Sequence, residues 1–179
     1  MHSDILTVKD LDRYLPAIKT NEDMRFKNKL SEGVFLSDAI DGLVELPDES
    51  IDLIITEPSN GPKNEKTKKN FPTYTNYLDW MEVWLTESSR VLKSTGSIYI
   101  FCPWESSGMY HSLLSKKFHV QSRITIERNN ENSDSSKSKW ENELFDIWFA
   151  TKTNDYIFNQ NYVVDGKICL LYTSDAADE

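Results

Sequence analysis

The sequence lacks several features that whole classes of protein require. Only two of its 179 residues are cysteines, Cys102 and Cys169, and they form no Cys-x-x-Cys pair. A disulfide scaffold and a cysteine-rich zinc site are therefore excluded. Its three histidines show no metal-ligand spacing, so no metal is expected. No apolar run approaches the ~20 residues of a membrane-spanning helix, and charges occupy the N-terminus where a signal peptide would be apolar. We expect a soluble, cytoplasmic protein with no membrane contact.

Basic residues are also scarce. Lys and Arg number 20 against 29 Asp and Glu, which gives a net charge of −9. Proteins that grip a phosphate backbone usually do so with clustered Lys and Arg. The balance argues against a nucleic-acid-binding surface over the whole molecule and leaves room for a local patch. The aromatic content of 12% is too high for a disordered chain, and the length suits one globular domain.

Helical and extended patterns alternate along the chain, which predicts an α/β fold with a mostly parallel sheet and a late antiparallel hairpin. The run Ile51–Ile55 is almost entirely apolar, as in a strand buried on both faces. Ser94–Gly96 is expected to end the longest helix, and a polar loop is expected over 129–139. The expected helices are 6–16, 39–46, 77–92 and 106–117, and the expected strands are 34–36, 51–55, 97–102, 119–128, 144–151 and 156–158.

The C-terminal residues have an unusual composition. Residues 169–179 read CLLYTSDAADE, which resembles the translation of a common sequencing adaptor. We expect this tail to be non-native and the reading frame to be cut near Ile168; the alternative is an ordinary polar tail. The expected organisation is an N-terminal lead-in over 1–32, a partial domain over 33–168 and the tail over 169–179.

Three segments stand in a characteristic order: LPDESIDLIITEPSNGP, NYLDWMEVWLTESSRVLKSTGSIYIF and DIWFATKTNDYIFN. This order resembles the N4-cytosine/N6-adenine DNA methyltransferases, in the circularly permuted, beta-class-like arrangement that places the catalytic strand first. The resemblance covers about residues 33–163. It implies an incomplete Rossmann-like sheet. It also implies transfer of a methyl group from S-adenosylmethionine to adenine N6 or cytosine N4 in double-stranded DNA, in the context of restriction-modification.

The catalytic motif of that family reads (Asp/Asn/Ser)-Pro-Pro-aromatic, and the matching residues here are Glu57-Pro58-Ser59-Asn60. The exocyclic amine of a base is a poor nucleophile, because its lone pair is delocalised into the ring. The enzyme flips the base out of the duplex. The first side chain and a following carbonyl accept the amine's hydrogens, and the aromatic ring stacks on the base, a contact of roughly 1–3 kcal/mol.

This motif departs from the family pattern, since only its first proline matches. Glu57 is one methylene longer than Asp, and Asn60 offers no ring; Phe71 and Tyr74 are the candidate replacements. Some members of the family have degenerate motifs and serve as partner subunits. The alternative interpretation is therefore a non-catalytic subunit that binds DNA or an active partner, and a homodimer is a further expected assembly.

Two residues are candidates for binding the cofactor. Asp38 follows the first strand of the resemblance, where an acid faces the adenine or ribose of S-adenosylmethionine; the alternative role is a helix N-cap. Trp104 follows a strand at the end where α/β sheets bind ligands, so it is a candidate to face the cofactor or the base. The glycine-rich cofactor loop of the family is expected after residue 163, and the chain contains no Gly-x-Gly.

The remaining candidates are basic and aromatic. Four lysines directly after the motif either follow DNA phosphates beside a flipped base or belong to a solvated loop: Lys63, Lys66, Lys68 and Lys69. Three tryptophans at helix or strand spacing are expected to pack in the core: Trp80, Trp84 and Trp148.

Overall fold

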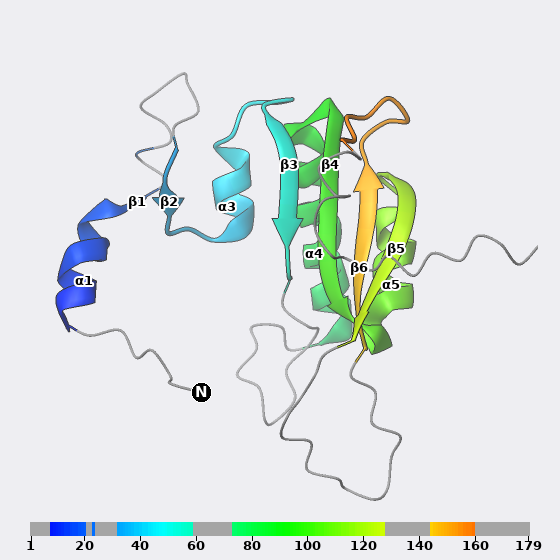
Figure 1. Ribbon diagram of the computed structural model, residues 1–179, viewed down its shortest axis with the longest axis horizontal. Coiled ribbons are helices and arrows are strands. Elements are labelled where there is room, and N and C mark those ends of the chain that lie inside the picture. The colour runs from blue at the N-terminus through cyan, green and yellow to red at the C-terminus, as the bar shows by residue number, and fades with distance from the viewer. Residues whose placement is uncertain (1–7, 21–22, 24–31, 59–72, 128–143, 160–179) are drawn as a thin grey trace, which may run out of the picture.

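The computed structural model describes residues 8–20, 23, 32–58, 73–127 and 144–159. Its centre is a four-stranded sheet in the order β3-β4-β6-β5, in which β3 pairs in parallel with β4 while β6 runs antiparallel to both β4 and β5. Three strands therefore point the same way and one opposes them (Figure 1), which confirms the expected fold class. The bounds are β3 Ile51–Thr56, β4 Leu92–Pro103, β5 His119–Glu127 and β6 Leu144–Thr151.

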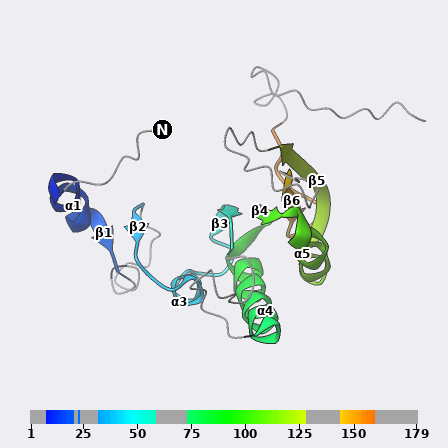
Figure 2. The same ribbon diagram turned by 90° about the horizontal axis from the view of Figure 1, so that it is seen from below.

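Two helices cover one face of this sheet, as Figure 2 shows. They are α4 (Tyr74–Val91) and α5 (Ser107–Leu114). One apolar side of α4 is buried against the centre of β4, where neither Ile98 nor Ile100 is exposed. Apolar residues three and four apart lie on one side of a helix, and this side packs on the sheet. The core residues of α4 are Tyr77, Met81, Trp84 and Leu85, with Trp80 packed beside them.

Helix α4 begins three residues before the predicted start. Thr73 caps it, since its hydroxyl accepts a hydrogen bond from the backbone N–H of Asn76 at 3.1 Å. The side chain thereby satisfies a backbone donor that the first turn of a helix leaves unpaired.

The expectation that the Ile51–Ile55 run is buried on both faces is wrong. Leu53 is 49% exposed and Ile55 is 64% exposed, whereas Ile54 packs on the core. In the part of the chain that the structure describes, β3 is an edge strand that pairs with β4 only. Because α4 and α5 cover the opposite face, the outward side chains of β3 meet solvent.

The transition from α4 to β4 also differs from the expectation. The strand begins at Leu92, directly after the helix, so Ser94–Gly96 is part of β4. The register advances from Ile51↔Leu92 to Leu53↔Ser97, which leaves extra residues of β4 unpaired at this point. A Cβ on Gly96 would lie 2.8 Å from Leu92 Cδ2 and 3.2 Å from the Asp52 carbonyl oxygen, so only glycine fits without displacing its neighbours.

The N-terminal elements lie to one side of the sheet (Figure 1). Strands β1 and β2 pair in parallel as a separate two-stranded sheet. Strand β1 belongs to the predicted lead-in and β2 to the predicted domain, and the division at residue 32 stays a prediction. The bounds are α1 Val8–Tyr14, η1 Leu15–Ala17, β1 Ile18–Lys19, β2 Val34–Phe35 and α3 Ala39–Val44.

Two further expectations need correction. The predicted helix over 106–117 consists of a 3-10 turn, η2 (Trp104–Ser106), followed by α5, which ends at Leu114. The segment over 156–158 forms no strand. Tyr156 and Phe158 instead pack their rings on Phe149 of β6, at centroid distances of 5.7 and 5.9 Å. No helix in the described ranges is long and apolar enough to cross a membrane.

Arg90 joins α4 to the connection between α3 and β3. Its guanidinium donates to the carbonyl oxygens of Leu43 at 2.8 Å and Leu46 at 2.9 Å. It also forms ion pairs with Asp48 and Glu87. Hydrogen bonding to Asp48 is the largest cause that raises the pKa of Arg90. A planar fork of N–H donors suits this set of acceptors, which a single ammonium group cannot match.

We expect Arg90→Ala to lower the free energy of unfolding by about 2–4 kcal/mol, because hydrogen bonds from charged groups contribute ~1.5–3 kcal/mol each and the substitution leaves part-buried carbonyls unpaired. Arg90→Lys keeps the charge and should recover less than half of that loss. Urea denaturation followed by circular dichroism measures both variants. A lysine variant as stable as the original chain would contradict the fork geometry.

Candidate functional site

The predicted motif begins where β3 ends. The last ladder pair of β3 is Thr56↔Ile100, and Glu57 and Pro58 follow it directly. Glu57 is exposed while Pro58 is buried. The chain is thus held at the proline and presents the carboxylate to solvent at the carboxyl edge of the sheet, where α/β proteins bind ligands. Ser59 and Asn60 lie outside the described residues.

A buried pair of tyrosines lies near this motif, and no pattern in the sequence indicates it. The hydroxyls of Tyr77 on α4 and Tyr110 on α5 are 2.6 Å apart, and neither residue is exposed. Burial is the main cause that raises the pKa of Tyr110; hydrogen bonding to Tyr77 raises it further, and so does the negative charge of Glu57. The carboxylate of Glu57 therefore lies within electrostatic reach of the pair.

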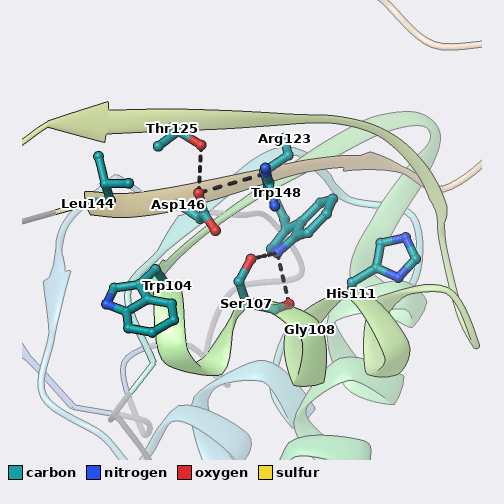
Figure 3. Close-up of a pocket in the computed structure, with 9 residues that line it drawn as sticks. All are labelled: Trp104, Ser107, Gly108, His111, Arg123, Thr125, Leu144, Asp146 and Trp148. Atoms are coloured by element: carbon teal, nitrogen blue, oxygen red, sulfur yellow. Dashed lines mark hydrogen bonds and ion pairs between the residues drawn. The ribbon is translucent and has the colours of Figure 1, made fainter. Parts of the chain in front are cut away.

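A cavity of about 550 Å³ opens beyond the carboxyl end of β4. Figure 3 shows that its walls come from η2 and α5 on one side and from β5 and β6 on the other. The wall combines aromatic rings with both signs of charge. The lining residues are Trp104, Ser107, Gly108, His111, Arg123, Thr125, Leu144, Asp146 and Trp148.

Asp146 is the buried charge of this cavity, since it is only 4% exposed. Its Oδ1 accepts a hydrogen bond from the hydroxyl of Thr125 at 2.7 Å and lies 3.9 Å from Nε of Arg123. A buried carboxylate needs such partners, because burial without them is costly. Both partners come from β5, whose Thr125 stands opposite Asp146 in the ladder.

The aromatic wall is held by hydrogen bonds. The indole N–H of Trp148 donates to the hydroxyl of Ser107 at 3.1 Å and to its carbonyl oxygen at 3.2 Å. The ring of His111 lies 4.8 Å from that of Trp148. Trp104 is 43% exposed on the other side of Ser107 (Figure 3). Trp148 thus packs partly on the core, as expected, and also lines the cavity.

The two candidate cofactor residues belong to different elements of the described structure. Asp38 caps α3, where its Oδ1 accepts a hydrogen bond from the N–H of Ile40 at 2.9 Å. This helix lies beside β3 on the side away from β4 (Figure 1), whereas Trp104 follows β4. The capping role of Asp38 is confirmed, and binding of a cofactor by Asp38 and Trp104 stays a prediction.

Several expected site residues lie outside the described part of the chain. They are the lysines Lys63, Lys66, Lys68 and Lys69, the alternative ring Phe71 and the loop 129–139. Tyr74, the other alternative ring, is the first residue of α4 and is half-exposed. Among the described residues, no group of three or more His, Cys, Asp or Glu side chains could hold a metal ion.

Cys102 lies behind the cavity wall and is fully buried. Burial, followed by the negative charge of Asp146, raises the pKa of its thiol to about 12, against a smaller lowering effect of the Ser107 hydrogen bond. Above about pH 9, the ordinary value, the unfolded chain loses this proton while the native chain keeps it. The resulting contribution to stability is complete below pH 9 and is lost as the pH rises toward 12.

We expect Cys102 in a Cys169→Ser variant to resist Ellman's reagent at pH 8 in the native chain and to react at once in denaturant, because the thiolate is the reactive form. Between pH 8 and pH 10, the melting temperature should fall less in the matched Cys102→Ala variant than in the original chain. Rapid labelling of the native chain would contradict the burial of this thiol.

The comparisons with known proteins identify the family of the chain. A family model described as DNA methylase, for N6 and N4 methyltransferases, matches residues 51–167. The type II methyltransferase M.HpaI of Haemophilus parainfluenzae is 41% identical over 73 residues, which cover 40% of this chain and 23% of that protein. The DNA adenine methyltransferase YhdJ of Escherichia coli is 33% identical over 109 residues, which cover 58% of this chain and 35% of that protein.

Solved structures share the fold. The PvuII cytosine-N4-specific DNA methyltransferase matches with a TM-score of 0.62 at 16% identity, over 83% of this chain and 56% of that one. The M1.HpyAVI complex with SAM matches with a TM-score of 0.51 at 17% identity, over 79% of this chain and 59% of that one. The chain thus spans only part of the length of each relative. Because the family model matches more than half of the chain's residues, the chain belongs to the N6/N4 DNA methylase family.

Proposed function

We propose that this chain is the catalytic part of a DNA methyltransferase that moves a methyl group from S-adenosylmethionine to the exocyclic amine of adenine or cytosine. The observation that carries the proposal is the position of Glu57-Pro58 at the carboxyl end of β3, within the segment that the family model matches. The substrate is double-stranded DNA with the target base flipped out, and the protein acts in the cytoplasm.

The described residues of the motif have the chemistry to prepare the amine. The exposed carboxylate of Glu57 accepts one hydrogen of the amine, and the carbonyl of Pro58 accepts the other. Both contacts favour a pyramidal nitrogen whose lone pair is directed away from the ring. Pro58 is buried, so the chain is anchored directly beside Glu57, and acceptors on an anchored chain cost little reorganisation during the reaction.

The described residues do not by themselves form a pocket for S-adenosylmethionine. Asp38 caps α3, whereas Trp104 belongs to η2, which follows β4, and lines the cavity described above without Asp38. The carboxylate of Asp38 is already engaged as a helix cap through one oxygen. The role proposed for this part of the chain is therefore to hold the target amine of the base.

The four lysines after the motif belong to the same proposal. Lys63, Lys66, Lys68 and Lys69 immediately follow the residues that would hold the flipped base. Contacts of lysines with phosphates position a protein on DNA without reading its sequence. They would supply a local basic patch on a chain whose net charge is −9.

A second candidate function is that of a non-catalytic subunit, alone or as a homodimer, that binds DNA or an active partner. Two substitutions in the motif favour it: Ser59 replaces the second proline of the family pattern, and Asn60 replaces the aromatic ring. Loss of the stacking ring would remove roughly 1–3 kcal/mol of contact with the base.

Glu57→Ala should lower methyl transfer by roughly 10²–10³-fold, the usual cost of removing one group that stabilises the reacting atoms. Mass spectrometry of nucleosides, after incubation of unmethylated DNA with S-adenosylmethionine and the chain, measures N6-methyladenine and N4-methylcytosine. Glu57→Gln is the matched control, because it keeps an acceptor oxygen and should retain part of the activity. Equal turnover by the alanine variant would reject the role of Glu57.

The double variant Ser59→Pro, Asn60→Tyr separates the two candidate functions. A weakened enzyme should gain activity, because the variant restores the family's motif and a ring for the base. A non-catalytic subunit should show no methylated nucleoside in either form. The single variant Ser59→Pro controls for the proline, since it adds no ring.

A further inference from the structure

The cavity beside Trp104 is separate from the Glu57-Pro58 motif. Pro58 continues β3 past the Thr56↔Ile100 pair, while Asp146 of β6 stands opposite Cys102 on the far side of β4. Strands of a sheet lie ~4.8 Å apart, so two spacings put Asp146 about 10 Å from Pro58. Neither Glu57 nor Pro58 lines the cavity, and β4 stands between the motif and Asp146.

The walls of the cavity suit a flat ring. Trp104 stands on one side and His111 on the other, and two hydrogen bonds to Ser107 hold Trp148 between them (Figure 3). Exposed aromatic rings at such sites are the surfaces on which unstacked bases pack. The volume of about 550 Å³ lies within the range of small-molecule sites, roughly 300–1,000 Å³.

Asp146 determines which edge of a ring is accepted. Its Oδ1 has the hydroxyl of Thr125 at 2.7 Å, and Arg123 at 3.9 Å is beyond full hydrogen-bond distance. The other carboxylate oxygen points into the cavity (Figure 3). An ionised carboxylate only accepts hydrogen bonds, so the ligand must present N–H groups at this point.

We propose that this cavity is a second nucleobase subsite, which takes an unstacked base adjacent to the target base with its ring on Trp104 and its exocyclic amine donating to Asp146. Cytosine, adenine and guanine carry such an amine. Thymine has no exocyclic amine, and its ring N–H lies between two carbonyl oxygens. The carboxylate repels these oxygens, because both groups are hydrogen-bond acceptors. The subsite thus helps to select the bases beside the target. The inference rests on the proposed function, because that function brings DNA to this edge of the sheet.

Titration of the ¹⁵N-labelled 179-residue chain with free nucleosides tests the subsite without any methyl transfer. The five tryptophans give five indole N–H signals, and loss of a signal in Trp104→Phe or Trp148→Phe assigns it. Deoxycytidine should shift the indole signals of Trp104 and Trp148 saturably. Deoxyuridine differs from it by a carbonyl in place of the amine and should bind at least about fivefold more weakly, the loss of one good edge contact.

Matched variants assign the two contacts. Trp104→Ala should weaken binding of deoxycytidine at least about fivefold, read from the Trp148 signal, whereas Trp104→Phe should retain most of it. Asp146→Asn keeps the size of the side chain and removes the charge, so the preference for deoxycytidine over deoxyuridine should fall to within about twofold. Tyr14→Ala removes an exposed ring on α1 and should change nothing. Since Trp104 is on the surface, its variants remain informative if Asp146→Asn fails to fold.

Three results would overturn the inference: no saturable shift, equal shifts with both nucleosides, or undiminished binding in Trp104→Ala. Loss of the Trp104 and Trp148 shifts in Glu57→Ala would overturn it as well, because it would place the base at the motif. The proposed function stands or falls separately. If the chain methylates DNA but nucleosides cause no shifts, only the subsite is rejected. If nucleosides cause the shifts but DNA is not methylated, only the proposed function is rejected.

Discussion

The guanidinium of Arg90 fixes where β3 begins, and the position of β3 determines where Glu57 and Pro58 lie at the carboxyl edge of the sheet. A central strand is held along its length by two ladders, but β3 has one ladder in the described part of the chain. Its position is secured by contacts at its start: Arg90 holds the carbonyls of Leu43 and Leu46, and the N–H of Ser50 donates to the Val91 carbonyl at 2.8 Å. Lys93 adds an ion pair to Asp52.

The other end of the family's sequence pattern has a comparable role. The ammonium of Lys152 donates to the carbonyl oxygen of Leu92 at 2.6 Å. The hydroxyl of Thr153 donates to the carbonyl oxygen of Ser94 at 2.9 Å. These bonds satisfy carbonyls in the stretch of β4 where the ladder to β3 is interrupted. Residues over 50 positions apart in the sequence thus hold the same irregular stretch of β4, which explains why VLKSTG and DIWFATK belong together in one pattern.

Sequence patterns predicted the positions of α4, β5 and β6 well. In α4 the reason is periodicity, because one apolar side packs on the core. It failed for β3, since an apolar run does not reveal whether both faces have a partner. It also failed at Leu92, where helix and strand join with no turn residue between them. At the candidate site, the motif predicted Glu57 and Pro58. The Tyr77–Tyr110 pair joins α4 to α5, and the cavity around Asp146 lies between η2 and α5 on one side and β5 and β6 on the other. No local signal in the sequence predicts either convergence.

The outward side of β3 has a practical consequence for the isolated chain. Leu53 and Ile55 stand on an edge strand, which has a neighbouring strand on one side only in the described part of the structure. Such an edge is a template on which a second molecule adds a strand, and apolar side chains strengthen the pairing. Concentrated samples should therefore accumulate dimers and larger aggregates through β3. The substitution Ile55→Lys should keep the samples monodisperse and leave the packing of the helix-covered face unchanged.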